Sequence, residues 1–132
     1  MPNRKQRIVP PEVEARGLTA TAVRTDAELR LRRAGIRVLT REESLQVPGT
    51  PYLYLNAVIT RGNMYWGDSL LVSFRQTVLL DRDPGVRLDA ETWSVWAGGG
   101  IYAPENIARK VRDGFNDLVD EFINAYLAMN PK

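Results

Sequence analysis

Apolar residues recur at helical spacing in two distant parts of the chain. In the first part they are spaced four, four and three residues apart and lie on one helix face. Thr19 precedes this stripe as a candidate N-cap, and Gly35 follows it as a candidate C′ residue. The pattern predicts a surface helix between Thr19 and Gly35 with one buried face. The stripe consists of Val23, Ala27, Leu31 and Ala34.

The second stripe is longer and more apolar. Pro104 suits the N1 position of its helix, and Pro131 ends it. We expect this helix to lie across a sheet, because it is the longest and most apolar helix of the chain. The stripe comprises Ile107, Val111, Phe115, Leu118, Phe122 and Tyr126, widened by Val119, Ile123 and Leu127.

Between the two stripes, apolar residues alternate with polar ones, as in half-buried strands. Residues 52 to 60 and 70 to 80 each place a row of apolar side chains on one face, and the loop from 61 to 69 is rich enough in Gly and Asn to join them as an antiparallel hairpin. Residues 92 to 97 form a third strand, with Trp93 and Val95 on one side and Trp96 on the other.

Shorter signals complete the element order. Residues 36 to 39 read as a short strand, and Thr40 with Glu43 forms a capping box for a brief helix through about Gln46. Residues 81 to 90 read as a connection, and residues 98 to 100, all glycine, as a flexible one. Residues 1 to 17 are expected to be poorly ordered or to form a clipped first strand near Ile8 and Val9.

These elements predict one α+β domain over residues 1 to 132. The expected fold is a two-layer sandwich with a mainly antiparallel sheet of three long strands plus one or two short ones. An N-terminal helix and the long C-terminal helix pack against this sheet. No stretch approaches the ~20 apolar residues needed to cross a bilayer.

The chain contains no histidine and no cysteine. Imidazole and thiolate are the usual groups for proton transfer near neutral pH, nucleophilic attack and tight transition-metal binding. The acidic stretch from Asp81 to Glu91 also lacks the Gly and Glu that an EF-hand needs at its sixth and twelfth positions, where Val86 and Thr92 stand. We therefore expect no enzyme activity, no cofactor and no metal site.

Charge is distributed unevenly around a net value of +2. Residues 1 to 41 hold ten Lys/Arg and four Asp/Glu, whereas the rest hold eight and twelve. Arg30, Arg33 and Arg37 are candidates for binding an anionic partner. Asp26 stands four residues before Arg30, and Glu28 four before Arg32, so acidic neighbours neutralise part of this helix and make nucleic acid an unlikely partner.

Aromatic residues concentrate in the half of the chain that forms the sheet. Tyr and Trp combine a large apolar area with a polar tip, which suits a protein, peptide or glycan partner as well as a strand core. Tyr65 and Trp66 lie in the connection between the first two strands, where burial is hard. The candidate partner-binding residues are Tyr65, Trp66, Trp96 and Tyr102.

Several segments resemble a family of small uncharacterised bacterial proteins that are often made with a signal peptide. The resemblance rests on residues 18–19, 25–39, 51–56 and 118–132. The element order is also similar, more weakly, to the amino-terminal domain of the Tol-Pal periplasmic propeller protein and to domains of curli-secretion-type lipoproteins. The resemblance implies an envelope interaction module and carries no catalytic residue. It favours a periplasmic or secreted location if a leader was removed, and a cytoplasmic one if Met1 is the native start.

The resulting hypothesis is a non-enzymatic protein-interaction domain of the bacterial envelope. It would bind a protein partner, or a second copy of itself, through an open sheet edge, the exposed sheet face or the aromatic hairpin. Two alternatives stay open. One is a basic module that binds nucleic acid or an anionic surface, and the other is a small-molecule-binding domain or an enzyme that uses carboxylates.

Overall fold

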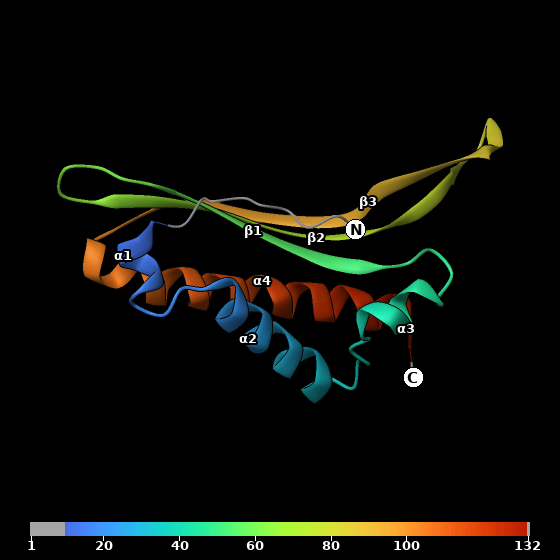
Figure 1. The fold of residues 1–132 in the computed structure, drawn as a ribbon, viewed down its shortest axis with the longest axis horizontal. Coiled ribbons are helices and arrows are strands. Elements are labelled where there is room, and N and C mark those ends of the chain that lie inside the picture. The colour runs from blue at the N-terminus through green and yellow to red at the C-terminus, as the bar shows by residue number, and fades with distance from the viewer. Residues whose placement is uncertain (1–9, 132) are drawn as a thin grey trace.

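The fold consists of one antiparallel sheet with a helical layer on one side (Figure 1). The computed structural model describes residues 10–131. The helical layer contains α1 (Pro11–Glu14), α2 (Ala20–Arg33), α3 (Arg41–Leu45) and, after a 3-10 turn at Pro104–Asn106, α4 (Ile107–Met129). The sheet contains β1 (Tyr52–Thr60), β2 (Trp66–Leu80) and β3 (Asp83–Tyr102) in the order β1-β2-β3. The α+β sandwich expected from the sequence is confirmed.

The central strand β2 sets the register of the sheet. It pairs antiparallel with β1 from Tyr52↔Arg75 to Thr60↔Gly67, and with β3 from Trp66↔Tyr102 to Leu80↔Asp83. The β2–β3 register shifts at three points, including one between Asp68 and Ser69, where Gly99 is the extra residue of a bulge. Gly99 has φ +80°, a conformation that glycine adopts without steric strain.

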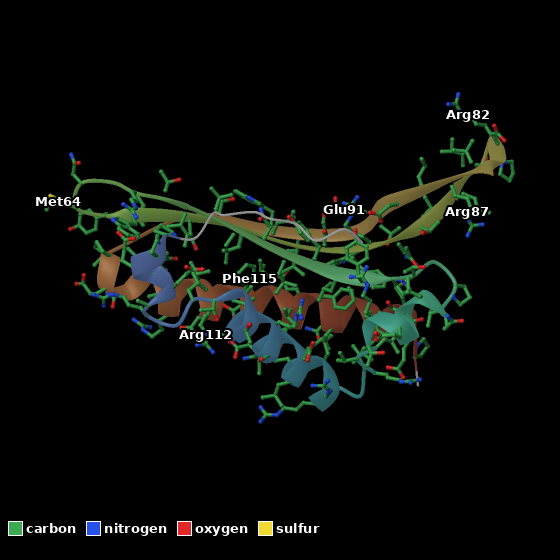
Figure 2. The ribbon with its side chains drawn as sticks, viewed as in Figure 1. Met64, Arg82, Arg87, Glu91, Arg112 and Phe115 are labelled. Atoms are coloured by element: carbon green, nitrogen blue, oxygen red, sulfur yellow. The ribbon has the colours of Figure 1, made fainter. Side chains whose placement is uncertain are left out.

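The core lies between the sheet and α4. Alternate residues of the strands face the helix. The predicted apolar stripe of α4 packs against them, and its residues Val111, Phe115, Leu118 and Phe122 are buried. Phe122 packs its ring 5.2 Å from that of Phe74 and 5.4 Å from that of Trp93. Figure 2 shows Phe115 between the two layers. The prediction that the last helix crosses the sheet is confirmed.

The predicted ends of α2 and the predicted start of α3 are also confirmed, whereas the predicted start of α4 at Pro104 is wrong. The Thr19 hydroxyl accepts the Ala22 N–H at 3.0 Å, and Gly35 adopts φ +81° directly after the last turn of α2. Thr40 and Glu43 form the reciprocal capping box that starts α3. Pro104 opens the 3-10 turn rather than α4 itself, which begins at Ile107.

Four local predictions are wrong. Residues 36 to 39 form no strand, because Ile36 packs against the Ala27, Val119 and Ile123 cluster instead of joining the sheet. The sheet of residues 10–131 accordingly has three strands and no short additional ones. Residues 81 to 90 and the Gly98–Gly100 run are expected as connections but belong almost entirely to β3, since β2 pairs with them. Residues 11 to 14 form helix α1, in which Val13 is buried. The strand expected at Ile8 and Val9 lies outside the described residues.

The hairpin of β2 and β3 extends past the rest of the fold. The first residue of β1, Tyr52, lies opposite Arg75, so from Gln76 onward β3 is the only strand that pairs with β2 in the described sheet. Figure 1 shows this part of the hairpin reaching beyond the end of α4 and bending away from the helical layer. We call residues 76–90 the arm.

Candidate functional site

Large apolar side chains are exposed together at one end of the sheet. They are Val58, Met64, Tyr65, Trp96 and Ile101, with exposed fractions of 43, 73, 57, 65 and 70%. Met64 lies at the end of the molecule opposite to the arm tip, which Arg82 marks in Figure 2. We call these five residues the apolar patch. Most exposed apolar residues in proteins are scattered singly, so a group of five is a candidate interaction site.

Strand pairing brings the patch together on the sheet face opposite to α4. Val58 lies opposite Ser69, and Ile101 lies opposite Gly67, two residues along the same face of β2. Trp96 donates its indole N–H to the Ser69 hydroxyl at 2.9 Å, which directs the ring toward the β2 residue that lies opposite Val58. The glycines leave room for this arrangement, because a Cβ on Gly98 would come within 2.8 Å of the Trp96 ring.

The hairpin between β1 and β2 supplies the rest of the patch. Met64, Tyr65 and Ile101 line a shallow hollow of about 540 Å³ together with residues 60–63, 66 and 67. The hollow is open to solvent, so it suits a side chain of a partner more than an enclosed small molecule.

The structure separates the four aromatic candidates into two pairs. Tyr65 and Trp96 are exposed and belong to the apolar patch. Trp66 is 9% exposed and belongs to the core, with the Arg61 guanidinium 5.3 Å from its ring centre. Tyr102 packs against the same core, with Lys110 over its ring. The aromatic composition of the sheet pointed to the patch, but the exposed aliphatic residues Met64 and Ile101 carry no such signal.

The candidate anion-binding arginines are largely paired. Arg30 donates from Nη1 to both carboxylate oxygens of Asp120 at 2.9 Å, and Arg37 forms an ion pair with Glu43. Arg33 lines a hollow of about 440 Å³ between α2 and α4. Two of the three arginines therefore have a carboxylate partner, which lowers the positive potential that an anion would meet.

Ion pairs between α2 and α4 were not expected from the sequence. Arg112 binds Asp26 through two N–H groups, each at 2.9 Å, and Figure 2 shows Arg112 on the helical side of the fold. The hydrogen bond to Asp26 raises the pKa of Arg112. The expected pair of Asp26 with Arg30 does not form, whereas the expected pair of Glu28 with Arg32 is present at 3.5 Å.

A second polar network joins the base of the arm to β1. The Tyr52 hydroxyl donates to Oδ2 of Asp89 at 2.8 Å, and Arg75 approaches the same oxygen at 3.5 Å. Burial, together with the hydrogen bond to Asp89, raises the pKa of the Tyr52 phenol. This network holds the carboxylate of Asp89 on the face of the arm opposite to the helical layer.

Within residues 10–131, no group of three or more acidic side chains is arranged to hold a metal ion. In the same range, no helix is long and apolar enough to cross a membrane.

The fold and the patch define a small α+β sandwich with exposed apolar side chains gathered at one end of its sheet. Comparisons of the chain with protein-family models, with curated proteins and with solved structures find no match. Function is therefore inferred from the surface of this chain alone.

Proposed function

We propose that this protein is a protein-interaction domain that binds its partner through the apolar patch. The observation that carries the proposal is the gathering of Val58, Met64, Tyr65, Trp96 and Ile101, all more than 40% exposed, over one end of the sheet. Aromatic and Met side chains are typical anchors of protein interfaces, because each buries a large area when bound.

The geometry of the patch fits an extended peptide or a flat protein surface. Ser69 and the glycines at positions 67 and 98 form a low floor, and Trp96 and Ile101 rise from it. A partner side chain that enters the hollow beside Tyr65 would lie between apolar walls. The other two functional classes have less support, because two of the three candidate arginines are paired with carboxylates and the hollows are open.

Selection of binding peptides from a displayed library tests the proposal. We expect the selected peptides to carry aromatic or aliphatic anchors and to bind at least ~10-fold more weakly to the triple variant Tyr65→Ser, Trp96→Ser, Ile101→Ser. The fluorescence of Trp96 gives a direct readout. The summed emission of Trp66, Trp93 and Trp96 should shift to the blue on binding, because Trp96 is 65% exposed in the free protein and becomes covered by the peptide.

Leu45→Ser is the matched control, because Leu45 is 57% exposed on α3, away from the patch. Selected peptides should keep their affinity for this variant. Peptides that bind the triple variant as tightly as the wild type would refute the patch as the binding surface.

A further inference from the structure

The arm has apolar side chains that nothing in the described chain covers. Val78 lies opposite Leu88 on the face continuous with the core, yet Leu88 is 44% exposed because α4 does not reach the arm. Leu79 on the other face is 52% exposed. An isolated two-stranded ribbon is only marginally stable in water, so the arm would gain stability from a further strand.

β3 is an edge strand of the sheet formed by residues 10–131. One hydrogen bond shows which of its backbone groups point outward. Thr77 donates its N–H to the Gly49 carbonyl at 2.7 Å, on the side away from β3. Directly opposed residues of antiparallel strands both point toward each other or both point away. Asp89, the partner of Thr77, therefore directs its N–H and C=O to the open edge, as does Arg87 two residues along.

The side chains along this edge are complementary to themselves. The sequence Val86-Arg87-Leu88-Asp89-Ala90 places a cation and an anion at equal distances on either side of Leu88. If two copies pair antiparallel around a two-fold axis at Leu88, Arg87 of each lies opposite Asp89 of the other. The outward backbone groups of these residues then hydrogen-bond across the axis. Leu88 meets Leu88, and Val86 meets Ala90, on the apolar face.

Neighbouring registers oppose like charges at the axis. An axis at Arg87 would oppose two arginines, and an axis at Asp89 would oppose two aspartates. Opposed like charges are destabilising on a sheet, whereas opposed unlike charges are favourable. The axis at Leu88 is thus the register of this segment that satisfies charge, apolar contact and backbone direction together.

Asp89 is already oriented for this contact. Tyr52 and Arg75 both bind its Oδ2 atom, which leaves Oδ1 directed to neither of them. Arg87 forms no ion pair within residues 10–131, and Figure 2 shows it on the arm away from the helices. A guanidinium from a second copy would complete the coordination of this carboxylate.

The geometry points to a second copy of this chain as the partner of the arm, bound by antiparallel pairing of the two β3 edges around Leu88. The inference extends the proposed function by adding a second, separate interaction surface. It turns two ribbons of two strands into one continuous ribbon of four strands. The apolar patch lies at the opposite end of each copy and stays open in the pair.

Sedimentation of three samples tests the inference, using Arg87→Asp alone, Asp89→Arg alone and an equimolar mixture of the two. Each single variant opposes like charges in its own pair and should dissociate at least ~10-fold more readily than the wild type. In the mixed pair, both cross-strand contacts again oppose a carboxylate to a guanidinium, so the mixture should recover the dimer. Because pairing of one short strand segment buries a small area, the dimer should be weak, and the measurement should extend from ~20 to ~500 μM.

Arg82→Asp is the matched control, since Arg82 lies at the arm tip outside the paired segment. It should leave the dimer unchanged, and circular dichroism should show that all variants are folded. A wild-type monomer over the whole concentration range would overturn the inference, and so would a dimer that neither single variant weakens. Both results leave peptide binding at Tyr65 and Trp96 unaffected, so the failure of one proposal is distinguishable from the failure of the other.

Discussion

At the scale of single residues, burial changes the ionisation of one carboxyl group of the sheet, that of Asp68. Asp68 lies on the helix-side face of β2, opposite Ile59 of β1 and Gly100 of β3. Burial raises the pKa of this carboxyl, and the hydrogen bonds from the backbone of Gly100 and Asp68 offset only part of that effect. The charged form of Asp68 is therefore less favourable in the folded protein than in the unfolded chain.

We expect Asp68→Asn to stabilise the protein at neutral pH. With the pKa raised in the folded state, the folded protein binds more protons, so stability falls as pH rises through the window above the ordinary pKa of ~4. Asn keeps the acceptor for the backbone N–H groups and removes the charge. The melting temperature of the variant should exceed that of the wild type at pH 7, and the difference should vanish below about pH 4. An equal difference at both pH values would contradict the burial argument.

Phe122 joins the helical layer to the sheet through aromatic contacts. Its ring contacts those of Phe74, Trp93 and Tyr126 at centre distances between 5.2 and 5.7 Å, and it is 5% exposed. Phe122→Ala should lower the free energy of unfolding by ~3–5 kcal/mol, through lost burial and the cavity left behind. Urea denaturation measures this loss. Met129→Ala, at an 81% exposed position of the same helix, should change stability by less than ~0.5 kcal/mol.

At the scale of elements, local signals predicted helix ends well and strand ends poorly. The Thr19 cap, the Gly35 stop and the Thr40–Glu43 box depend on neighbours within a few residues, so they can be read from the sequence. The ends of β3 depend on β2, a partner that no local pattern reveals. Residues such as Pro84 and Gly85 indicate a turn, yet they belong to the strand Asp83–Tyr102, at an irregularity between the pairs Leu79↔Arg87 and Leu80↔Asp83.

Charge pairs and the apolar patch also depend on residues that are distant in the sequence, so local patterns do not predict them. Asp26 and Arg30 have the spacing of an ion pair within one helix. Each pairs instead with a residue of α4, Asp26 with Arg112 and Arg30 with Asp120. Tyr65 and Trp66 are adjacent in sequence, but one is exposed and the other buried. Sequence alone indicated that aromatic residues matter in this half of the chain. Only the register of the sheet shows which of them share a surface.

The pairing of Arg112 with Asp26 should contribute measurably to the docking of α2 on α4. A double-mutant cycle with Arg112→Ala and Asp26→Ala should give a coupling energy of ~1 kcal/mol, because the pair is bidentate and partly buried. The pair of Arg109 with Asp113 serves for comparison. Its atoms are 3.8 Å apart and its side chains are about 60% exposed, so its coupling should be near ~0.3 kcal/mol. Equal coupling energies would mean that the bidentate geometry adds nothing.

At the scale of the whole molecule, stability is expected to fall from the core toward the arm. α4 and the centre of the sheet share most of the buried side chains, and the arm shares none. Amide hydrogen exchange should therefore be slow at Val72 and Phe115 and faster at Val78 and Leu88. At high protein concentration, the amides of Arg87 and Asp89 should become slower if the arms pair, while those of the Met64 hairpin should not change.

The order of the elements along the chain has a consequence for synthesis. α4 follows all three strands in the chain, yet it covers the apolar face of β2 and β3 outside the arm. A nascent chain emerging at ~5–20 residues per second therefore presents the sequence of the sheet before the helix that covers it. During that interval Leu70, Val72 and Phe74 are accessible to chaperones, and the emergence of α4 is the step that closes the core.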